Sequence, residues 1–283
     1  MSGHVDGIVV LTLRARLDDP LDMSGVTPDQ CIAQSEAEIA ALPVWLGSDR
    51  ARVGDLFTVR GERAARLEIE GDLAGVTGVG AGTASGELIV RGHAGRQAAA
   101  RMTGGLVHVH GSVSDDAGMA MAGGVLRIDG HAGDRVGGAT PGASKGMTGG
   151  EIVVFGSVGA AAAALVRRGL VAVVGSVGPY AGRGMIAGTL LALGPIGAQP
   201  GSGNKRGSIV AAGGIEVPAT YRLACTFEPP HMRLLLTSLQ RRFGFPVEPG
   251  LRDGEYRRYC GDAGEPGKGE LLVWTGHGPR ARS

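Results

Sequence analysis

Apolar residues recur through the middle of the chain in a fixed pattern: a glycine, alternating variable and apolar residues, and a second glycine. Seven glycines begin this pattern, at spacings of 19, 19, 26, 19, 19 and 19 residues: Gly86, Gly105, Gly124, Gly150, Gly169, Gly188 and Gly207. A weaker copy, ARLEIEG, begins at Ala65. Self-similarity at a fixed period is the signature of repeat architectures. The pattern therefore predicts about eight repeats.

The period within each repeat is two residues, because the third and fifth positions are apolar in every copy. In the first full repeat these positions are Leu88 and Val90. Such alternation predicts a short strand with one buried face. Nineteen residues span about 60 Å of extended chain, which suits one turn of a three-sided coil. We therefore expect an all-β fold, a right-handed parallel β-helix of about eight 19-residue coils, with α/β caps at both ends.

A second column of residues supports the stacked coils. Three residues before the coil glycine, the chain places Met102, Met121, Met147, Val166, Met185 and Asn204. Methionine fills irregular gaps in protein cores. This column is therefore expected to lie inside the stack, at a corner of the coils.

The two ends of the chain lack the repeat. At the N-terminal end, Ser35 and Glu38 form a capping box that predicts a short helix. Near the C-terminus, Pro229 and Pro230 open a predicted helix that Gly244 closes, with Met232, Leu235, Leu236, Leu239 and Phe243 on one face. We expect an N-terminal α/β cap over residues 1–64, the repeat domain over 65–217, and a C-terminal helix and tail over 218–283.

The single 26-residue spacing marks a seven-residue insertion around Gly137 to Lys145. Insertions in repeat proteins tend to fall on a working face. The segment carries Arg135 and Lys145, which are candidate contacts for an anionic group. A surface loop without such a role is the alternative.

The outward positions of the strands change character along the stack. In the early repeats the fourth and sixth residues are often polar, whereas from Gly150 onward they become apolar. The later positions include Val153, Phe155, Val174, Leu191 and Leu193. A soluble monomer seldom exposes such an area, so we expect this face to be covered. The cover is either the chain's own C-terminal helix or a partner protein.

Composition narrows the classes of function. Glycine accounts for 52 of 283 residues and aromatic residues for 4%, which suits small side chains stacked in a repeating scaffold. A net charge of +1 gives no electrostatic argument for binding nucleic acid or a membrane surface. The three cysteines lie far apart and indicate neither a disulfide framework nor a thiolate metal site. With no signal-peptide pattern and no long apolar stretch, we expect a cytoplasmic protein.

No motif in the chain predicts catalysis. GATPGASK at Gly138–Lys145 has the wrong spacing for a phosphate loop, and there is no G-x-S-x-G nucleophile elbow. His108 and His110 alternate on one strand and are expected to be surface side chains. We find no carboxylate or cysteine in their columns, so no metal site and no catalytic residue is predicted.

Several motifs of the chain resemble those of a known protein family. Gly-Asp-Arg-x-Gly from Gly133 and Lys-Gly-Met-x-Gly-Gly from Lys145, set in the Gly-x-Ile-x-Val-x-Gly repeat, are similar to the C (gamma) subunits of the formylmethanofuran dehydrogenase family. Thr27-Pro28-Asp29 and the tail Gly267-Lys268-Gly269-Glu270-Leu271 match the ends of that family. The repeat alone also resembles the C-terminal β-helix of glutamate synthase.

The resemblance implies a non-catalytic structural subunit in one of two settings. In the first, a formyltransferase/hydrolase complex moves a formyl group from formyl-tetrahydromethanopterin to a methanofuran-type carrier and releases formate. In the alternative, a tungsten or molybdenum formylmethanofuran dehydrogenase works in methanogenesis from CO2. Arginine supplies 25 of the 28 basic residues, a bias typical of GC-rich bacterial genomes, which favours the first setting.

The same resemblance implies which molecules surround the chain. The expected partners are amidohydrolase-like, formyltransferase and molybdopterin-enzyme-like subunits. The carrier and the metal are expected to belong to those partners, with no cofactor bound by this chain.

Overall fold

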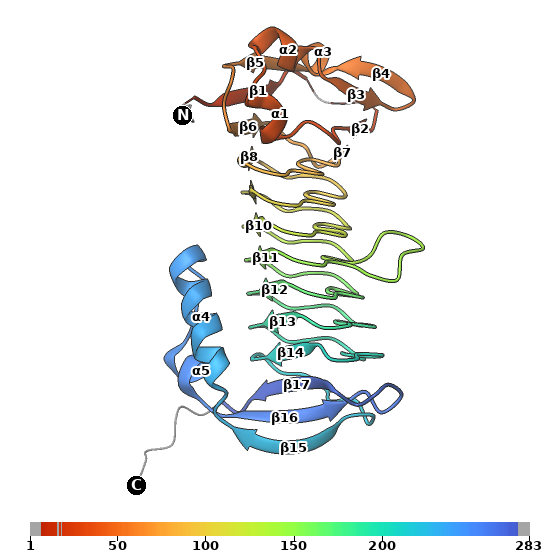
Figure 1. The fold of residues 1–283 in the computed structure, drawn as a ribbon, viewed down its shortest axis with the longest axis vertical. Coiled ribbons are helices and arrows are strands. Elements are labelled where there is room, and N and C mark those ends of the chain that lie inside the picture. The colour runs from red at the N-terminus through yellow and green to blue at the C-terminus, as the bar shows by residue number, and fades with distance from the viewer. Residues whose placement is uncertain (1–6, 16, 18, 277–283) are drawn as a thin grey trace.

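The computed structural model describes residues 7–15, 17 and 19–276. Residues 1–6, 16 and 18 of the expected N-terminal cap and residues 277–283 of the expected C-terminal tail lie outside the described ranges. The described chain is mostly β and is dominated by one 13-stranded sheet that is rich in parallel pairs. Its strand order is β15-β16-β17-β14-β13-β12-β11-β10-β9-β8-β6-β1-β5. From β8 to β14 the strands follow one another in chain order, one from each repeat, and Figure 1 shows them stacked along the long axis.

The strands of the repeats pair in parallel and in register. They are β6 (Arg66–Glu70), β8 (Glu87–Arg91), β9 (Leu106–Val109), β10 (Val125–Ile128), β11 (Glu151–Val154), β12 (Leu170–Val173), β13 (Thr189–Ala192) and β14 (Ser208–Ala211). Leu126 pairs with Val107 on one side and with Ile152 on the other, so equivalent positions of successive repeats lie side by side. Leu126 and Ile128 are fully buried, which confirms the predicted register.

Each repeat also joins its neighbours at two further columns. Isolated parallel bridges link one residue of each repeat to the next: Leu73, Ala94, Val113, Ala132, Val158, Val177, Ile196 and Ile215. At a third column the Gln97 amide donates to the Asp115 carbonyl, and the Asp116 amide donates to the Asp134 carbonyl. The predicted methionine column is confirmed as interior, since Met102, Met121, Met147, Val166, Met185 and Asn204 are all buried.

The N-terminal segment combines strands and short helices. In the large sheet, β1 (Val9–Leu13) lies between β6 and the antiparallel β5 (Phe57–Arg60). A second sheet has the order β4-β3-β2-β7, formed by β4 (Asp49–Arg52), β3 (Pro43–Leu46), β2 (Leu21–Asp22) and β7 (Val76–Thr77). The helices are α1 (Pro28–Cys31), α2 (Glu36–Ala40) and α3 (Val53–Leu56). The capping box of α2 is confirmed, with the Ser35 amide donating to Glu38 at 2.8 Å.

The C-terminal segment contains more strand than the sequence predicted. After β15 (Arg222–Phe227) come α4 (Pro230–Phe243), α5 (Pro249–Asp253), β16 (Tyr256–Gly261) and β17 (Gly269–Trp274). The last strand pairs in parallel with β14, so that Leu271 lies beside Ile209 and is buried. Gly269-Glu-Leu-Leu-Val copies the repeat pattern, and that similarity explains its place at the end of the ladder. Among the described helices, none is both long and apolar enough to cross a lipid bilayer.

The described residues form two large hydrophobic cores. The larger fills the inside of the coils and extends into the N-terminal segment. The second lies between the outward face of the later strands and the C-terminal segment, where α4 runs alongside the stack (Figure 1). Met232, Leu236 and Leu239 of α4 are buried in this second core. The left-handed conformation of Gly244 (φ 71°) ends the helix where the sequence predicted.

Candidate functional site

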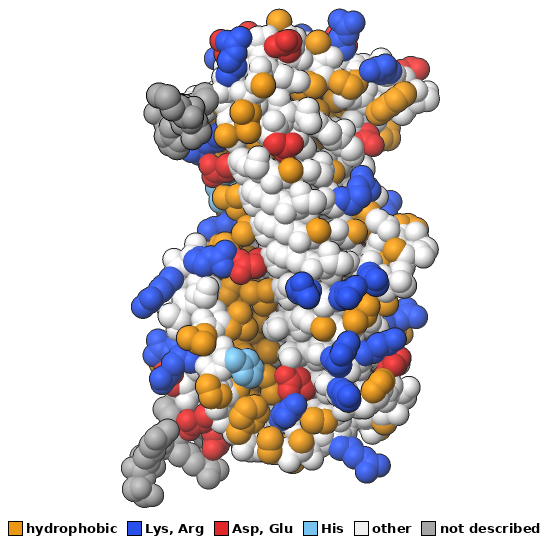
Figure 2. Space-filling view, viewed as in Figure 1, with side chains coloured by type: hydrophobic (Ala, Val, Ile, Leu, Met, Phe, Trp, Pro, Cys, Tyr) orange, Lys and Arg blue, Asp and Glu red, His pale blue; other side chains and the backbone are white. Residues whose placement is uncertain are grey.

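The later apolar face is covered by the chain's own C-terminal segment. Val153 and Leu191 are fully buried in the second core. Phe155, Val174 and Leu193 pack against that core and remain partly exposed. Figure 2 shows hydrophobic side chains in a band beside α4. These five residues therefore belong to the seam between the coils and the C-terminal segment.

Two polar contacts hold the C-terminal end of α4 against the sheet. Arg242 donates to Glu151 of β11 at 2.8 Å, and Arg127 of β10 donates to the Phe243 carbonyl at 3.3 Å. The Arg127 guanidinium also lies 4.8 Å from the centre of the Phe155 ring. The covered face thus ends near β10, and the outward face of the earlier strands carries polar side chains.

The predicted insertion leaves the stack and returns to the same place. The Gly137 amide donates to the Ala117 carbonyl at 2.8 Å, and the Met147 amide donates to the Gly137 carbonyl at 2.9 Å. The residues between Gly137 and Met147 form a loop that projects from the coils (Figure 1). The stack therefore continues on both sides of the insertion with its ladders unbroken.

A pocket of about 380 Å³ lies beside this loop. Its lining is mostly small and apolar, and Arg135 and Arg183 are the charged residues that line it. The remaining lining residues come from the loop and the two following coils: Gly138, Ala139, Thr140, Gly142, Ala143, Ala161, Ala164, Leu165 and Gly184. Lysine and arginine side chains are frequent on the half of the molecule that contains this loop and the later coils (Figure 2).

Arg135 is held by acidic side chains of the preceding coil. Its Nε and Nη2 donate to the two carboxylate oxygens of Asp116 at 2.7 and 3.0 Å, and Nη2 lies 3.4 Å from Asp115. Asp116 is buried and also accepts a hydrogen bond from Arg96 at 3.0 Å. Burial raises the pKa of Asp116, but hydrogen bonds from Arg135 and Arg96 outweigh burial and hold the pKa below its usual value. Arg135 thus links two coils beneath the loop.

Lys145 has a different setting. It lies on the loop, is exposed, and makes no ion pair with any described residue. It is also outside the lining of the pocket. Of the two cations predicted from sequence, one is therefore engaged within the chain and the other points to solvent.

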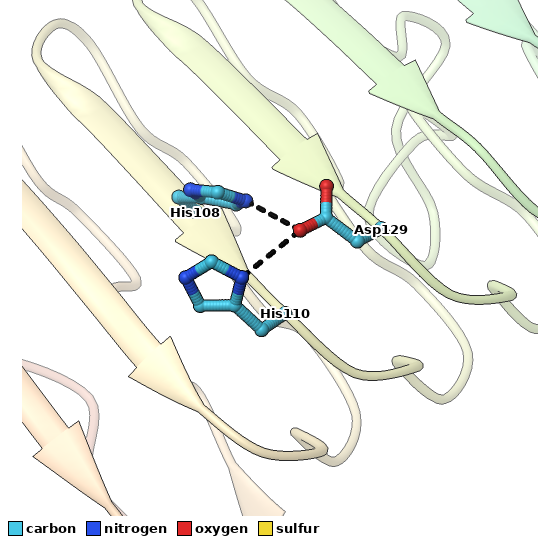
Figure 3. A group of neighbouring side chains, drawn as sticks. All are labelled: His108, His110 and Asp129. Carbon is cyan, nitrogen blue, oxygen red and sulfur yellow. Dashed lines mark hydrogen bonds and ion pairs between the residues drawn. The ribbon is translucent and has the colours of Figure 1, made fainter.

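A third group of side chains lies on the outward face of β9 and β10, just beyond the end of α4. His108 Nε2 and His110 Nδ1 lie 2.8 and 3.0 Å from the same oxygen of Asp129, Oδ2 (Figure 3). Arg127 donates to the other carboxylate oxygen at 2.8 Å. Arg91 Nη1 approaches His110 Nε2 at 3.2 Å. We call His108, His110 and Asp129 the histidine cluster.

The environment sets the charge of this cluster. Burial lowers the pKa of His108 and outweighs the neighbouring Asp129 carboxylate, which raises it. Burial raises the pKa of Asp129, but hydrogen bonds from Arg127 and His108 outweigh burial and leave the pKa low. The cluster therefore combines an ionised carboxylate with an imidazole that favours its neutral form.

The expectation that no carboxylate shares a column with these histidines is wrong. His110 and Asp129 occupy the same sixth position in successive repeats, and parallel pairing of β9 with β10 brings that position together. His108 pairs with Arg127 in the same register. Reading each outward column across neighbouring repeats would have found the cluster.

Sequence comparison finds known proteins that are similar to part of the chain. No family model matches the chain. Over 90 residues it is 31% identical to the C subunit of the tungsten-containing formylmethanofuran dehydrogenase 2 of Methanothermobacter wolfeii, and 32% identical to that of Methanothermobacter thermautotrophicus. These matches cover 30% of this chain and 33% of each relative, so the chain spans about a third of the length of these curated relatives.

A solved structure matches more fully. It is a chain of the formyltransferase/hydrolase complex (FhcABCD) from Methylorubrum extorquens, determined in complex with methylofuran. The two are 33% identical and superpose with a TM-score of 0.86. The match covers 93% of this chain and 98% of the other.

Proposed function

The chain belongs to the family of formylmethanofuran dehydrogenase C subunits, and from this premise we propose that it is a structural subunit of a formyltransferase/hydrolase complex. One observation carries the proposal: the similarity to a chain of such a complex runs over nearly the full length of both chains. The proposed complex transfers a formyl group from formyl-tetrahydromethanopterin to a methanofuran-type carrier and releases formate. This chain contributes shape and binding surfaces to it.

A tungsten or molybdenum formylmethanofuran dehydrogenase is the second candidate setting. The sequence similarity to the tungsten-containing enzymes over 90 residues favours it. The structural role proposed for the chain is the same in both settings. The two settings are distinguished by whether a partner subunit carries tungsten or molybdenum as a redox metal.

We infer that the stack of repeats is a right-handed parallel β-helix, whose rigidity suits a positioning role. Three columns of backbone contacts joining successive repeats support this inference. Connections between parallel strands of one sheet are right-handed in about 98% of cases. A coil closed by three ladders resists bending between its ends, so partners bound to different coils would keep a fixed separation.

We propose that partner subunits supply the reacting groups, the carrier site and the metal. These partners are amidohydrolase-like, formyltransferase and molybdopterin-enzyme-like chains. Because the apolar seam is filled by the chain's own α4, partners would contact the remaining faces and the insertion loop.

We also propose that the loop and its pocket contact an anionic group, either an acidic partner loop or the anionic tail of the carrier. Arg183 lines the pocket and Lys145 lies on the loop, and neither forms an ion pair with a described side chain. Arg135 lines the pocket but is bonded to Asp116, so its part is to hold the coil beneath the pocket.

Purification of the native complex tests the main proposal. The chain should co-elute with the three proposed partner types, and the fraction should transfer formyl groups to a methanofuran-type carrier. Stoichiometric tungsten or molybdenum together with formylmethanofuran oxidation would identify the second setting. Elution of the chain alone, with no formyl-handling partner, would contradict the proposed function.

The anion proposal has its own test. A Lys145→Ala, Arg183→Ala double variant should weaken assembly or raise the KM for the carrier, while Arg135→Ala should also lower thermal stability. Arg50→Ala, an exposed cation in the N-terminal sheet, is the matched control. Normal assembly and normal kinetics of the double variant would leave the loop without this role.

A further inference from the structure

We propose that His108, His110 and Asp129 form a binding site for a divalent first-row transition ion, with Zn²⁺ as the representative ion. The site lies on the outward face of β9 and β10, which the C-terminal helix leaves uncovered. The proposal goes beyond the role in a formyl-handling complex and does not depend on it. It rests on the placement of three ligand atoms by two paired strands.

The backbone fixes the three side chains on one surface. Alternate residues of an extended chain point to the same side, so His108 of β9 and His110, which directly follows β9, project together. The register pairs Arg127 with His108, and Asp129 and His110 each lie two residues further along, just after the last pair of the two strands, Ile128 and Val109. The imidazole centroids are 4.1 Å apart, and the available ligand atoms all lie within 4.8 Å of one another. No large backbone movement is needed to bring the ligands together.

The present contacts occupy the positions that a metal would take. His108 Nε2 and His110 Nδ1 both approach Asp129 Oδ2, at 2.8 and 3.0 Å. Zn²⁺ bonds of about 2.1 Å in a tetrahedral arrangement need ligand atoms about 3.4 Å apart. Each imidazole nitrogen therefore has to move only about half an ångström away from Asp129 Oδ2 to reach the separation that an ion between them requires. Two imidazoles and one carboxylate also leave a fourth position open.

The donor chemistry favours zinc and its neighbours over calcium or magnesium. Imidazole nitrogen suits zinc, copper, nickel and cobalt, whereas calcium and magnesium prefer oxygen ligands. The His108 side chain is only 17% exposed, so its imidazole is partly shielded from solvent. Arg127 holds Asp129 Oδ1 and leaves Oδ2 directed at the imidazoles. Such outer contacts orient metal ligands and raise affinity.

The Arg91 side chain is expected to disfavour metal binding at the histidine cluster, so its replacement tests the proposal. A guanidinium only donates hydrogen bonds, so the contact between Arg91 Nη1 and His110 Nε2 places the His110 proton on Nδ1. A metal bound at Nδ1 displaces that proton and requires a proton on Nε2 instead. Arg91 must then turn away, and its ion pair with Glu68 gives it a position to occupy. Arg91 should therefore weaken metal binding by both geometry and charge.

Zinc titration of the full chain, with any affinity tag removed and buffers freed of metal, measures the site directly. Calorimetry should show one Zn²⁺ per chain, and Co²⁺ should give the visible absorption of a four-coordinate site. His110→Ala and Asp129→Ala should each abolish this binding. His93→Ala and His131→Ala are matched controls, because those histidines bond to backbone amides of other coils and lie outside the cluster.

Two further variants distinguish a metal site with oriented ligands from unspecific binding of zinc to surface histidines. Arg91→Gln should tighten zinc binding, and Arg127→Met should weaken it about tenfold, as expected for loss of an orienting contact. Circular dichroism and thermal melting should show all variants folded, and a variant that does not fold is replaced by His108→Gln. Absence of zinc binding by the wild-type chain overturns the proposal. Equal loss of binding in His93→Ala and His110→Ala overturns it as well.

Discussion

Replacing Leu236 of α4 with alanine should cost the chain about 3 kcal/mol of stability. Leu236 is fully buried in the second core, where α4 covers the outward face of the later strands. Removing a buried leucine side chain loses its transfer free energy and leaves a cavity, which together cost about 2–5 kcal/mol. The middle of that range corresponds to a fall in melting temperature of roughly 10 °C for a chain of this size.

The same helix provides the matched control. Leu234 is 74% exposed, so Leu234→Ala removes the same atoms from water instead of from the core. Its effect should stay within about 0.5 kcal/mol, as is usual for surface positions. The comparison removes helix propensity from the result, because both variants place alanine in the same helix.

Two tryptophans allow the seam to be followed locally. Trp274 packs against the second core and donates its ring N–H to the Gly250 carbonyl at 3.2 Å, whereas Trp45 is 52% exposed on β3. In a Trp45→Phe background, fluorescence therefore reports the seam, and far-ultraviolet circular dichroism reports the whole chain. Leu236→Ala should lower the fluorescence midpoint. An unchanged midpoint, or an equal loss in Leu234→Ala, would refute the assignment of α4 as the cover of this face.

Three further variants test the packing of the interior and the hydrogen bonds at the corners of the coils. Ile128→Asp should prevent folding, because it buries an unpaired carboxylate among apolar side chains, and a soluble variant with normal melting would contradict the register. Asn204→Met restores the residue of earlier coils but removes both bonds to Gly207, so denaturant unfolding should show a loss of about 1–3 kcal/mol; equal stability would contradict this role. The folded-state pKa of Asp116 is lowered, so its contribution is full above the unfolded pKa and is lost as pH falls through the folded pKa. The stability gap between wild type and Asp116→Asn should therefore shrink in acid, and a gap independent of pH would contradict the ion pair with Arg135.

The repeat and its register could be predicted from sequence because they depend on local requirements. Alternation of apolar residues fixes which face of a strand is buried, and a constant spacing brings the same position to each coil. The interior methionine column, the capping box at Ser35 and the end of α4 at Gly244 follow from the same local chemistry. The apolar outward positions after Gly150 likewise required a cover, although they did not identify it.

Tertiary structure decided which distant segments meet. The chain returns after a long excursion to place β17 beside β14, and the path of that excursion lays α4 on the apolar face. Arg135 turns to Asp116 of the preceding coil because the corner brings the two side chains together. Asp129 joins His108 and His110 because parallel pairing brings together residues that lie about one repeat apart. Periodicity determines the strands one at a time, whereas contacts between side chains depend on how the strands and their connections close in space.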